Sequence, residues 1–393
     1  MMSSTWRSMS RAVVALTTLS PRFWPVSARP ASIGAASKGI TLGENTYESV
    51  QTYYGKVLSS SKDLKTSACT TASAPTNAFK KAIQHVPNEI LERFYGCGNP
   101  VPTGIRGLHV LDLGSGSGRD VYAAAVLVGE DGFVTGIDMT DEQLEVARSH
   151  VDEFTQKMGY AKPNIAFKKG MIEFLAEAGV EPESVDLVIS NCVVNLSPNK
   201  ELVIKGVYDA LREGGEFYFS DVYCDRRLPQ SARDHEVMVG ECLGGALYIE
   251  DFKRICHSVG FLDPRELSRE EIKVNDPELK ALCGNAKFYS ITYRCFKLAG
   301  METLCEDYGE VAIYKGTIED FPNEYSLDSG HVFEAHRPKL VCGNTASMVG
   351  ESWLRDHFEI IGNRNTHFGL FGATPAAEED SKTPAPSTGG GCC

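Results

Sequence analysis

Short apolar runs alternate with amphipathic segments through residues 107–223 of this 393-residue chain. The amphipathic segments carry apolar residues at helical spacing, while the apolar runs have the length of buried strands. Strands that alternate with helices indicate a parallel sheet with helical crossovers, so we expect a doubly wound α/β fold. The expected strands are 109–113, 134–137, 165–168, 185–190 and 216–221, and the expected helices include 121–128, 141–157 and 200–211.

The pattern changes on both sides of this region. Helical spacing recurs at 46–54 and 78–90, which predicts helical elements before the first strand. Short mixed segments, 291–298 and 311–315 among them, predict a small α+β domain near the C-terminus. We therefore expect five parts: an N-terminal tail (1–44), the α/β core (45–223), an inserted lid region with return elements of the core (224–289), the α+β domain (290–372) and a disordered, Cys-tipped tail (373–393).

Three glycines at alternate positions follow the first expected strand. Gly114, Gly116 and Gly118 separate that strand from the first helix, and Asp138 ends the second strand 20 residues after Gly118. Glycines at such a turn let the backbone approach a ligand, and the second-strand carboxylate can hold ribose hydroxyls. The layout predicts a nucleotide site at the first turn of the sheet.

Asp112 separates two candidate ligands for this site. A dinucleotide fingerprint has the spacing G-x-G-x-x-G, whereas this chain has G-x-G-x-G with an acid two residues before the first glycine. A carboxylate there would repel a pyrophosphate and would suit a cationic amino group. The D-x-G-x-G-x-G pattern resembles motif I of the class I methyltransferases, which implies their Rossmann-like sheet and S-adenosylmethionine as ligand.

Charge and composition narrow the class of protein further. The net charge of −13 argues against a general nucleic-acid-binding protein, which would carry a basic stripe. No apolar run reaches the roughly 18 residues of a membrane span. The first 43 residues are basic and serine-rich and contain no acid, which predicts a transit peptide. We therefore expect a mitochondrial or plastid protein, or a cytosolic one if this tail carries no address.

The 12 cysteines carry the main chemical signal. They include no C-x-x-C pair, which argues against a zinc ribbon, and most of them are expected to be small buried hydrophobes. Cys192 follows the fourth expected strand, at the edge where α/β sheets bind ligands. It is either a core thiol at a strand end or a nucleophile or soft-metal ligand beside the methyl donor. Thiolates prefer soft centres, and trivalent arsenic is a soft acceptor with a lone pair.

Several motifs match one known family in combination. Over roughly residues 46–370 the chain resembles the eukaryotic arsenite methyltransferases. The resemblance implies methylation of arsenite to mono- and dimethylated arsenicals with S-adenosylmethionine as methyl donor, as a route of arsenic detoxification. The matching segments are 50–58, 95–98, 111–120, 134–140, 190–196, 215–223 and 240–248.

The family works with four cysteines, which by motif are Cys69, Cys97, Cys192 and Cys242. The resemblance implies that Cys97, Cys192 and Cys242 bind As(III). It also implies that Cys69 and Cys97 exchange disulfides that keep arsenic trivalent, with thioredoxin or glutathione as thiol reductant. The expected partners are arsenite and methylarsenicals, free or as glutathione conjugates, and a thioredoxin-like protein; the chain itself is expected to be a monomer.

Residues around the donor follow from the same resemblance. Asp112 and the glycine loop would hold the methionine end, and Asp138 the ribose, unless it is a solvated turn acid. Met139 would face the adenine and Ile172 or Glu173 its edge, although core packing also suits Met139 and Ile172. The full set of expected donor contacts is Tyr95 (facing the sulfonium, or packing), Asp112, Gly114, Ser115, Gly116, Gly118, Asp138, Met139, Ile172, Glu173 and Asn191.

Two other interpretations remain open from the residues. A methyltransferase of the same fold could act on another small acceptor, which would make the cysteines incidental. A soft-metal thiol-binding protein would explain the cysteines but not Asp112, the three glycines and Asp138. The cysteines that match no family motif are expected to be structural or incidental: Cys224, Cys256, Cys283, Cys295, Cys305 and Cys342. The Cys392–Cys393 end would capture arsenic or have no role.

Overall fold

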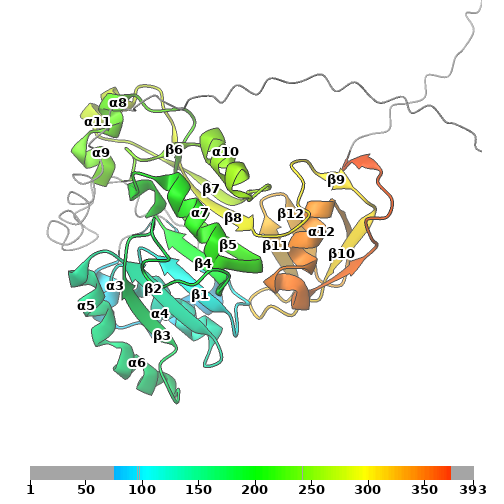
Figure 1. The fold of residues 1–393 in the computed structure, drawn as a ribbon, viewed down its shortest axis with the longest axis horizontal. Helices are drawn as coiled ribbons and strands as arrows, with labels where there is room; N and C mark the ends of the chain where they lie inside the picture. The colour runs from blue at the N-terminus through cyan, green and yellow to red at the C-terminus, as the bar shows by residue number, and fades with distance from the viewer. Residues whose placement is uncertain (1–74, 95, 97, 241, 373–393) are drawn as a thin grey trace, which may run out of the picture. The chain divides into compact units, whose positions relative to one another are not determined.

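A single large mixed sheet organises the chain in the computed structural model, which describes residues 75–94, 96, 98–240 and 242–372. Its strand order is β3-β2-β1-β4-β5-β8-β7, with β6 beside β5 (Figure 1). The strands are β1 (His109–Leu113), β2 (Phe133–Asp138), β3 (Ile165–Lys169), β4 (Val185–Asn191), β5 (Leu211–Cys224), β6 (Leu247–Tyr248), β7 (Arg265–Ile272) and β8 (Phe288–Phe296).

The first five strands pair in parallel, while β8 is antiparallel to both β5 and β7. The chain runs outward from β1 to β3 and then returns to place β4 on the other side of β1. The order therefore reverses between β1 and β4, which is where open α/β sheets bind ligands. The expected doubly wound α/β fold is confirmed, with all five expected strands present.

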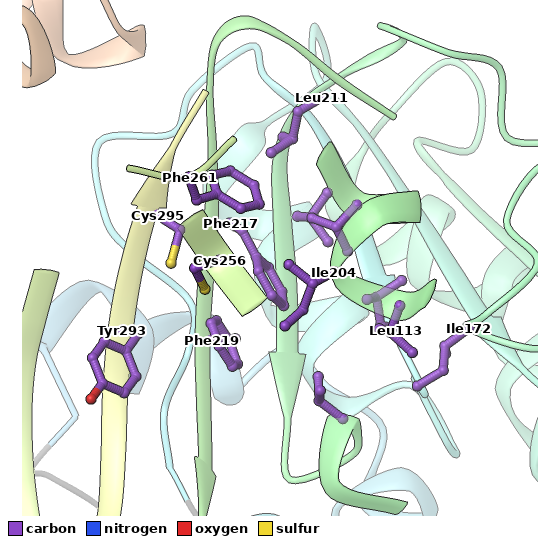
Figure 2. Close-up of a cluster of buried hydrophobic side chains, with 14 of the residues drawn as sticks. Leu113, Ile172, Ile204, Leu211, Phe217, Phe219, Cys256, Phe261, Tyr293 and Cys295 are labelled. Atoms are coloured by element: carbon purple, nitrogen blue, oxygen red, sulfur yellow. The ribbon is translucent and has the colours of Figure 1, made fainter. Parts of the chain in front are cut away.

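Helices cover both faces of the sheet because strand side chains alternate. Val110 packs with α4 (Arg119–Val128), α5 (Asp141–Ser149) and α6 (Val151–Met158) on one face. Leu111 and Leu113 pack on the other face, with α7 (Lys200–Ala210) and α10 (Ile249–Val259). Figure 2 shows this second core, where Leu113, Ile204, Phe217 and Phe261 lie together. Both cores are apolar, so the polar site lies at the strand ends.

The segment between β5 and β8 corresponds to the expected lid region. It contains α8 (Gln230–Arg233), α9 (Glu236–Gly240) and α11 (Pro277–Cys283) as well as α10 and β7. Residues of this segment form a third apolar cluster that includes both Cys192 and Cys242. The insertion therefore packs against the end of β4 rather than forming a separate body.

Some expected boundaries were wrong for identifiable reasons. The helix expected at 141–157 breaks at His150. The one expected at 78–90 is two helices: α2 (Asn77–Ile83) ends four residues before Pro87, and α3 (Asn88–Glu92) begins after it. The strand expected at 216–221 begins earlier, because β5 starts at Leu211 and the backbone of Gly214 and Gly215 pairs with Lys297. Local sequence favours a turn there, but pairing with a distant segment extends the strand.

The segment expected at 291–298 in the C-terminal domain is another correction. Residues 288–296 form β8, which lies between β5 and β7 in the central sheet. The boundary expected at residue 290 therefore falls inside a core strand. A short apolar run predicts a strand but not the sheet that it joins, because the partner strand is distant in sequence.

Residues after β8 form a smaller α+β unit with its own apolar core. Strands β13, β10 and β14 make a three-stranded sheet, β11 pairs with β12, and β9 pairs with β15. The elements are β9 (Glu306–Asp307), β10 (Glu310–Tyr314), β11 (Glu324–Asp328), β12 (His331–Glu334), β13 (Pro338–Val341), α12 (Gly343–Gly350), η4 (Trp353–His357), β14 (Phe358–Ile361) and β15 (Gly369–Leu370).

A buried ion pair connects this unit to the central sheet. Arg294 of β8 binds both carboxylate oxygens of Glu216 of β5, at 2.6 and 2.9 Å, and both side chains are almost fully buried. The same guanidinium donates to the hydroxyl of Tyr325, and the indole N–H of Trp353 donates to Glu216. A buried charge without a partner is costly, so the ion pair and its hydrogen bonds hold the two apolar cores together.

Several expectations lie outside the described residues. They concern the N-terminal tail, the helix expected at 46–54, the C-terminal tail, and the positions of Cys69, Tyr95 and Cys97. Within the part of the chain that is described, no helix has the length and hydrophobicity needed to cross a membrane.

Candidate functional site

A cavity of about 130 Å³ opens over the carboxyl ends of β1, β2 and β4, at the reversal of strand order. The glycine loop forms one wall, and the loop after β4 forms another. The expected donor contacts that line it are Asp112, Gly114, Ser115, Gly116, Asp138, Met139, Ile172, Glu173 and Asn191. Arg93, Phe94, Arg119, Asp120, Cys192 and Ser197 also line it. The structure thus brings together most of the donor residues that the sequence predicted.

Two glycines of the loop are required by its geometry. A Cβ atom on Gly114 would lie 2.4 Å from the side chain of Val193, so the loop after β4 could not approach. Gly116 has a left-handed backbone (φ +52°), and a Cβ atom there would point into open space. Gly118 does not line the cavity but caps the N-terminus of α4. The loop therefore presents bare backbone to the cavity.

Asp138 fixes the position of this loop. One carboxylate oxygen accepts the N–H of Gly116 at 2.9 Å, and the other accepts the N–H of Thr140 at 2.8 Å. Burial raises the pKa of Asp138, while these backbone hydrogen bonds oppose the rise. The sequence predicted a ribose contact at this residue; its role in bracing the loop was not anticipated, because hydrogen bonds between strand ends leave no local signal.

The cavity carries excess negative charge. Among the described residues, four acids line it (Asp112, Asp120, Asp138 and Glu173), whereas the basic residues that line it are Arg93 and Arg119. Burial raises the pKa of Asp112 well above its ordinary value, and the neighbouring Asp120 carboxylate raises it further. A cation bound beside Asp112 would relieve both effects. The electrostatics of the cavity therefore favour a positively charged ligand.

Asn191, at the end of β4, is committed to protein partners. Its side-chain oxygen accepts the N–H of Gly98, and its amide donates to the Gly98 carbonyl and to Asp120, all at 2.9–3.1 Å. The sequence predicted a contact with the amino-acid part of the donor. In the structure, the hydrogen bonds from Asn191 also hold Gly98 beside the end of β4, at the wall of the cavity.

Glu173 and Ile172 form the wall that follows β3. Both are buried, and the hydroxyl of Ser197 donates a hydrogen bond to the Glu173 carboxylate. Ser197 belongs to the loop after β4, so this contact joins two walls of the cavity. Met139 follows Asp138 directly and lines the same cavity.

The two described cysteines of the predicted set lie side by side. Cys192 follows β4 and lines the cavity, and the Cys242 thiol donates to the Cys192 carbonyl at 3.3 Å. Both residues are buried, and Cys192 takes part in a disulfide bond. Both also have left-handed backbones, with φ of 59° and 61°, among four such non-glycine residues in the described part of the chain. Strained backbone of this kind is concentrated at functional sites.

Lys200 and Asp221 are two further candidates, which the structure places near the predicted thiols. The Lys200 ammonium donates to the Ser197 carbonyl at 2.8 Å. Burial lowers the pKa of Lys200 to about 8, while Asp221, Cys242 and Glu173 act to raise it. Burial raises the pKa of Asp221 to about 7, and its carboxylate accepts the N–H groups of Asn195 and Val222. Lys200 is close enough to Asp221, Cys242 and Glu173 to interact with their charges, and these residues come from different segments of the chain.

Comparison with known proteins agrees with this geometry. Residues 106–260 match the profile of a methyltransferase domain. The arsenite methyltransferase of Aquipseudomonas alcaligenes is 47% identical over 351 residues, which cover 88% of this chain and 100% of that protein. The human arsenite methyltransferase is 40% identical over 362 residues, which cover 88% of this chain and 95% of that protein.

A solved structure shows the same architecture. The chain is similar to the crystal structure of an arsenic(III) S-adenosylmethionine methyltransferase from Chlamydomonas reinhardtii, with a TM-score of 0.74 and 59% sequence identity. The match covers 76% of this chain and 100% of that chain. The similarity therefore extends beyond the nucleotide-binding sheet, which many unrelated enzymes share.

Proposed function

The chain belongs to the arsenite methyltransferases, and we propose that it transfers the methyl group of S-adenosylmethionine to trivalent arsenic held by cysteine sulfurs. One observation carries this proposal. Cys192 lines the cavity at the strand ends. Cys242 comes from a segment 50 residues along the chain, and its thiol donates a hydrogen bond to the Cys192 carbonyl. Thiols next to a methyl-donor cavity suit a thiophilic acceptor.

The cavity has features that fit S-adenosylmethionine. Within the described residues, the buried Ser115 hydroxyl has no hydrogen-bond partner, although it lines the cavity. Gly116 leaves room for a ligand against the backbone. Asp112 and Asp138 supply carboxylates for a ligand that carries positive charge and ribose hydroxyls. A buried donor without a partner is uncommon in a folded protein, so a ligand at this position would satisfy it.

Methyl transfer to arsenic makes limited demands on the protein. Bound S-adenosylmethionine supplies a methyl group on a positively charged sulfur, and arsenic can accept it through its lone pair. No proton has to leave the acceptor, so no general base is needed. The residues of the chain act by orientation: the glycine loop, braced by Asp138, holds one reactant, and the thiols hold the other.

The thiol pair is the acceptor site of this proposal. Cys192 and Cys242 would bind arsenic as thiolates, and Cys97 precedes Gly98, which Asn191 fastens to the same edge of the sheet. Lys200 is close enough to Cys242 for their charges to interact, and a cation near a thiol is typical of reactive cysteines. The apolar cluster around Cys242 would exclude competing water.

Methyl transfer through the lone pair raises arsenic from the trivalent to the pentavalent state, so the cycle that we propose also needs two electrons: two thiols supply them by forming a disulfide, and arsenic returns to the trivalent state. Cys192 is disulfide-bonded, so it must be reduced before it can bind arsenic. Glutathione or thioredoxin would supply the two electrons by attacking this disulfide and leaving as its own oxidised form. The family resemblance implies that Cys69 and Cys97 carry out the exchange; the disulfide at Cys192 supports a part for Cys192 as well.

Product analysis with matched cysteine variants tests the function. Purified protein is incubated with arsenite, isotopically labelled S-adenosylmethionine and glutathione, and methylated arsenicals are separated and identified by mass. Cys242→Ser should abolish methyl transfer but still bind the donor. Cys283→Ser is the matched control, because Cys283 is buried in the same apolar cluster and its thiol lies 3.9 Å from the Met238 sulfur, away from the cavity.

The three interpretations give different outcomes. Methylated arsenic that requires both substrates and is lost only in Cys242→Ser supports the proposal. Equal turnover by Cys242→Ser and Cys283→Ser would overturn the thiol-held acceptor. Arsenite retention without donor binding would instead indicate a thiol-binding protein, and donor binding without arsenic methylation would indicate a different acceptor.

A further inference from the structure

Two cysteines that the proposed function does not use meet in the C-terminal unit. Cys305 is exposed and lies just before β9, whereas Cys342 is buried and precedes the first residue of α12. Neither is disulfide-bonded, and the two thiols are close enough to influence each other electrostatically, since β9 and α12, which they precede, are in contact. One thiol is therefore open to solvent while its partner lies directly behind it.

The surroundings hold Cys342 in a defined position. The Arg265 guanidinium donates to the Cys342 sulfur at 3.8 Å and to the Thr345 hydroxyl at 3.2 Å. Thr345 in turn lies 3.3 Å from the same sulfur. Arg265 is itself fixed by ion pairs with Asp263 and Asp328, at 2.7 and 3.0 Å. The buried sulfur is thus oriented by polar groups rather than by apolar packing.

A second thiol pair in the chain shows the contrast. Cys256 and Cys295 also influence each other electrostatically, but both are almost fully buried. Figure 2 shows their sulfur atoms beside Phe217 and Phe261 in the core of the sheet. That pair has no route for a ligand and behaves as small hydrophobic side chains. The pair at Cys305 differs in having an exposed member.

We propose that Cys305 and Cys342 form a second binding site for trivalent arsenic, separate from the donor cavity and specific for arsenicals with two exchangeable hydroxyl groups. Each thiol would form an S–As bond while one As–O bond breaks, and the thiol proton leaves with the hydroxyl as water. Arsenic stays trivalent, so no oxidant or reductant is consumed. Cys305 reacts first because it is accessible, and Cys342 then closes the chelate.

The protonation of the pair favours this chemistry over oxidation. Partial burial of the thiol, and then the neighbouring Cys342, raise the pKa of Cys305 to about 11, although Arg265 opposes the rise. Cys305 is therefore a thiol at neutral pH, whereas peroxide oxidation and disulfide exchange need a thiolate. Condensation with an As–OH group removes the proton as water, so a protonated thiol is a suitable reactant.

The experiment uses the full chain and reads binding rather than activity. Protein reduced with a phosphine is treated with phenylarsine oxide, digested with trypsin without thiols, and analysed by mass spectrometry. Trypsin releases Cys305 in residues 298–315 and Cys342 in residues 340–355, each as the only cysteine of its peptide. We expect these two peptides to be joined by one arsenic atom, and the peptide carrying Cys295 to stay unmodified.

Two variants separate the steps. Cys342→Ser keeps a residue that suits a helix start, so it should fold, and it should hold the arsenical on residues 298–315 only loosely. A wash with excess glutathione should strip at least ten times more arsenic from it than from the unaltered protein. Cys305→Ser should leave residues 340–355 without arsenic. Thermal unfolding confirms that both variants are folded.

Three results would overturn the proposal: no bridged peptides in the unaltered protein, equal retention by Cys342→Ser, or a direct disulfide between the two peptides in place of the arsenic bridge. The site does not depend on methyl transfer, since its assay contains no methyl donor. A failure of the proposed function would therefore leave a bridged product intact, and a missing bridge would leave methylation unaffected.

Discussion

Replacement of Gly116 by alanine separates donor binding from stability. The backbone of Gly116 is left-handed (φ +52°), which costs an alanine about 1–2 kcal/mol, partly offset by a less flexible unfolded chain. No protein atom lies within 4 Å of the added Cβ, so protein packing adds nothing to this loss. In the complex, however, the methyl group would occupy cavity space, and overpacking of one methyl costs about 1–3 kcal/mol. Donor affinity should therefore fall roughly 5- to 150-fold.

Gly159→Ala is the matched control for this variant. Gly159 follows α6, has φ of +73° and also has no atom within 4 Å of a Cβ, but it lies outside the cavity. Urea unfolding should show a similar loss of about 1 kcal/mol in both variants. Calorimetric titration with S-adenosylmethionine should show weakened binding only in Gly116→Ala. Equal affinity in the two variants would refute the assignment of the glycine loop to the donor.

Three further predictions follow from the charged groups. Asp138→Asn removes one carboxylate oxygen that accepts a hydrogen bond from the glycine loop, so the KM for the methyl donor should rise about tenfold. The KM for arsenite should stay constant in the same steady-state assays. An equal rise in both KM values would contradict the assignment of Asp138 to the donor site. The pKa of Asp112 is raised in the folded chain, so its carboxyl group keeps a proton to higher pH than an ordinary aspartate. A cationic donor favours the ionised form, so donor binding should release a proton from Asp112. Binding should therefore become tighter as the pH rises through that pKa. Titration calorimetry in two buffers of different ionisation enthalpy measures this release, and buffer-independent heats would exclude it. Arg294→Met leaves the Glu216 carboxylate buried without its partner and should lower the free energy of unfolding by about 3–5 kcal/mol, against less than about 1 kcal/mol for Arg269→Met, which breaks a more exposed pair. Equal losses in urea unfolding would contradict the role of burial.

Local sequence patterns were sufficient to predict the strands of the sheet, the glycine loop and the acid at the end of the second strand. Alternating strand and helix periods are properties of a few neighbouring residues, so they can be read along the chain. The same holds for Gly116 and Asp138, whose spacing along the strand–loop–helix unit places both at one edge of the sheet. The structure confirms the fold and brings these residues into one cavity.

Other features of the site depend on contacts between distant segments. Asn191 was assigned to the donor, but its amide binds Gly98 and Asp120, partners 93 and 71 residues away. The strand β8 was assigned to the wrong unit because its partner, β5, lies far away in sequence. Such pairings are selected by packing over the whole chain, and no local pattern encodes them.

By itself, then, the sequence determined the order of strands and helices, the nucleotide loop and the cysteines that carry the family resemblance, because each is written in residue type and spacing. Only the tertiary structure decided which thiols meet: Cys242 reaches Cys192 because the segment after β5 packs onto the end of β4, and Cys305 reaches Cys342 because β9 lies against α12. The physical reason is that a contact between remote side chains depends on the sum of burial and pairing across the fold, whereas a turn or a helix depends mainly on its own residues.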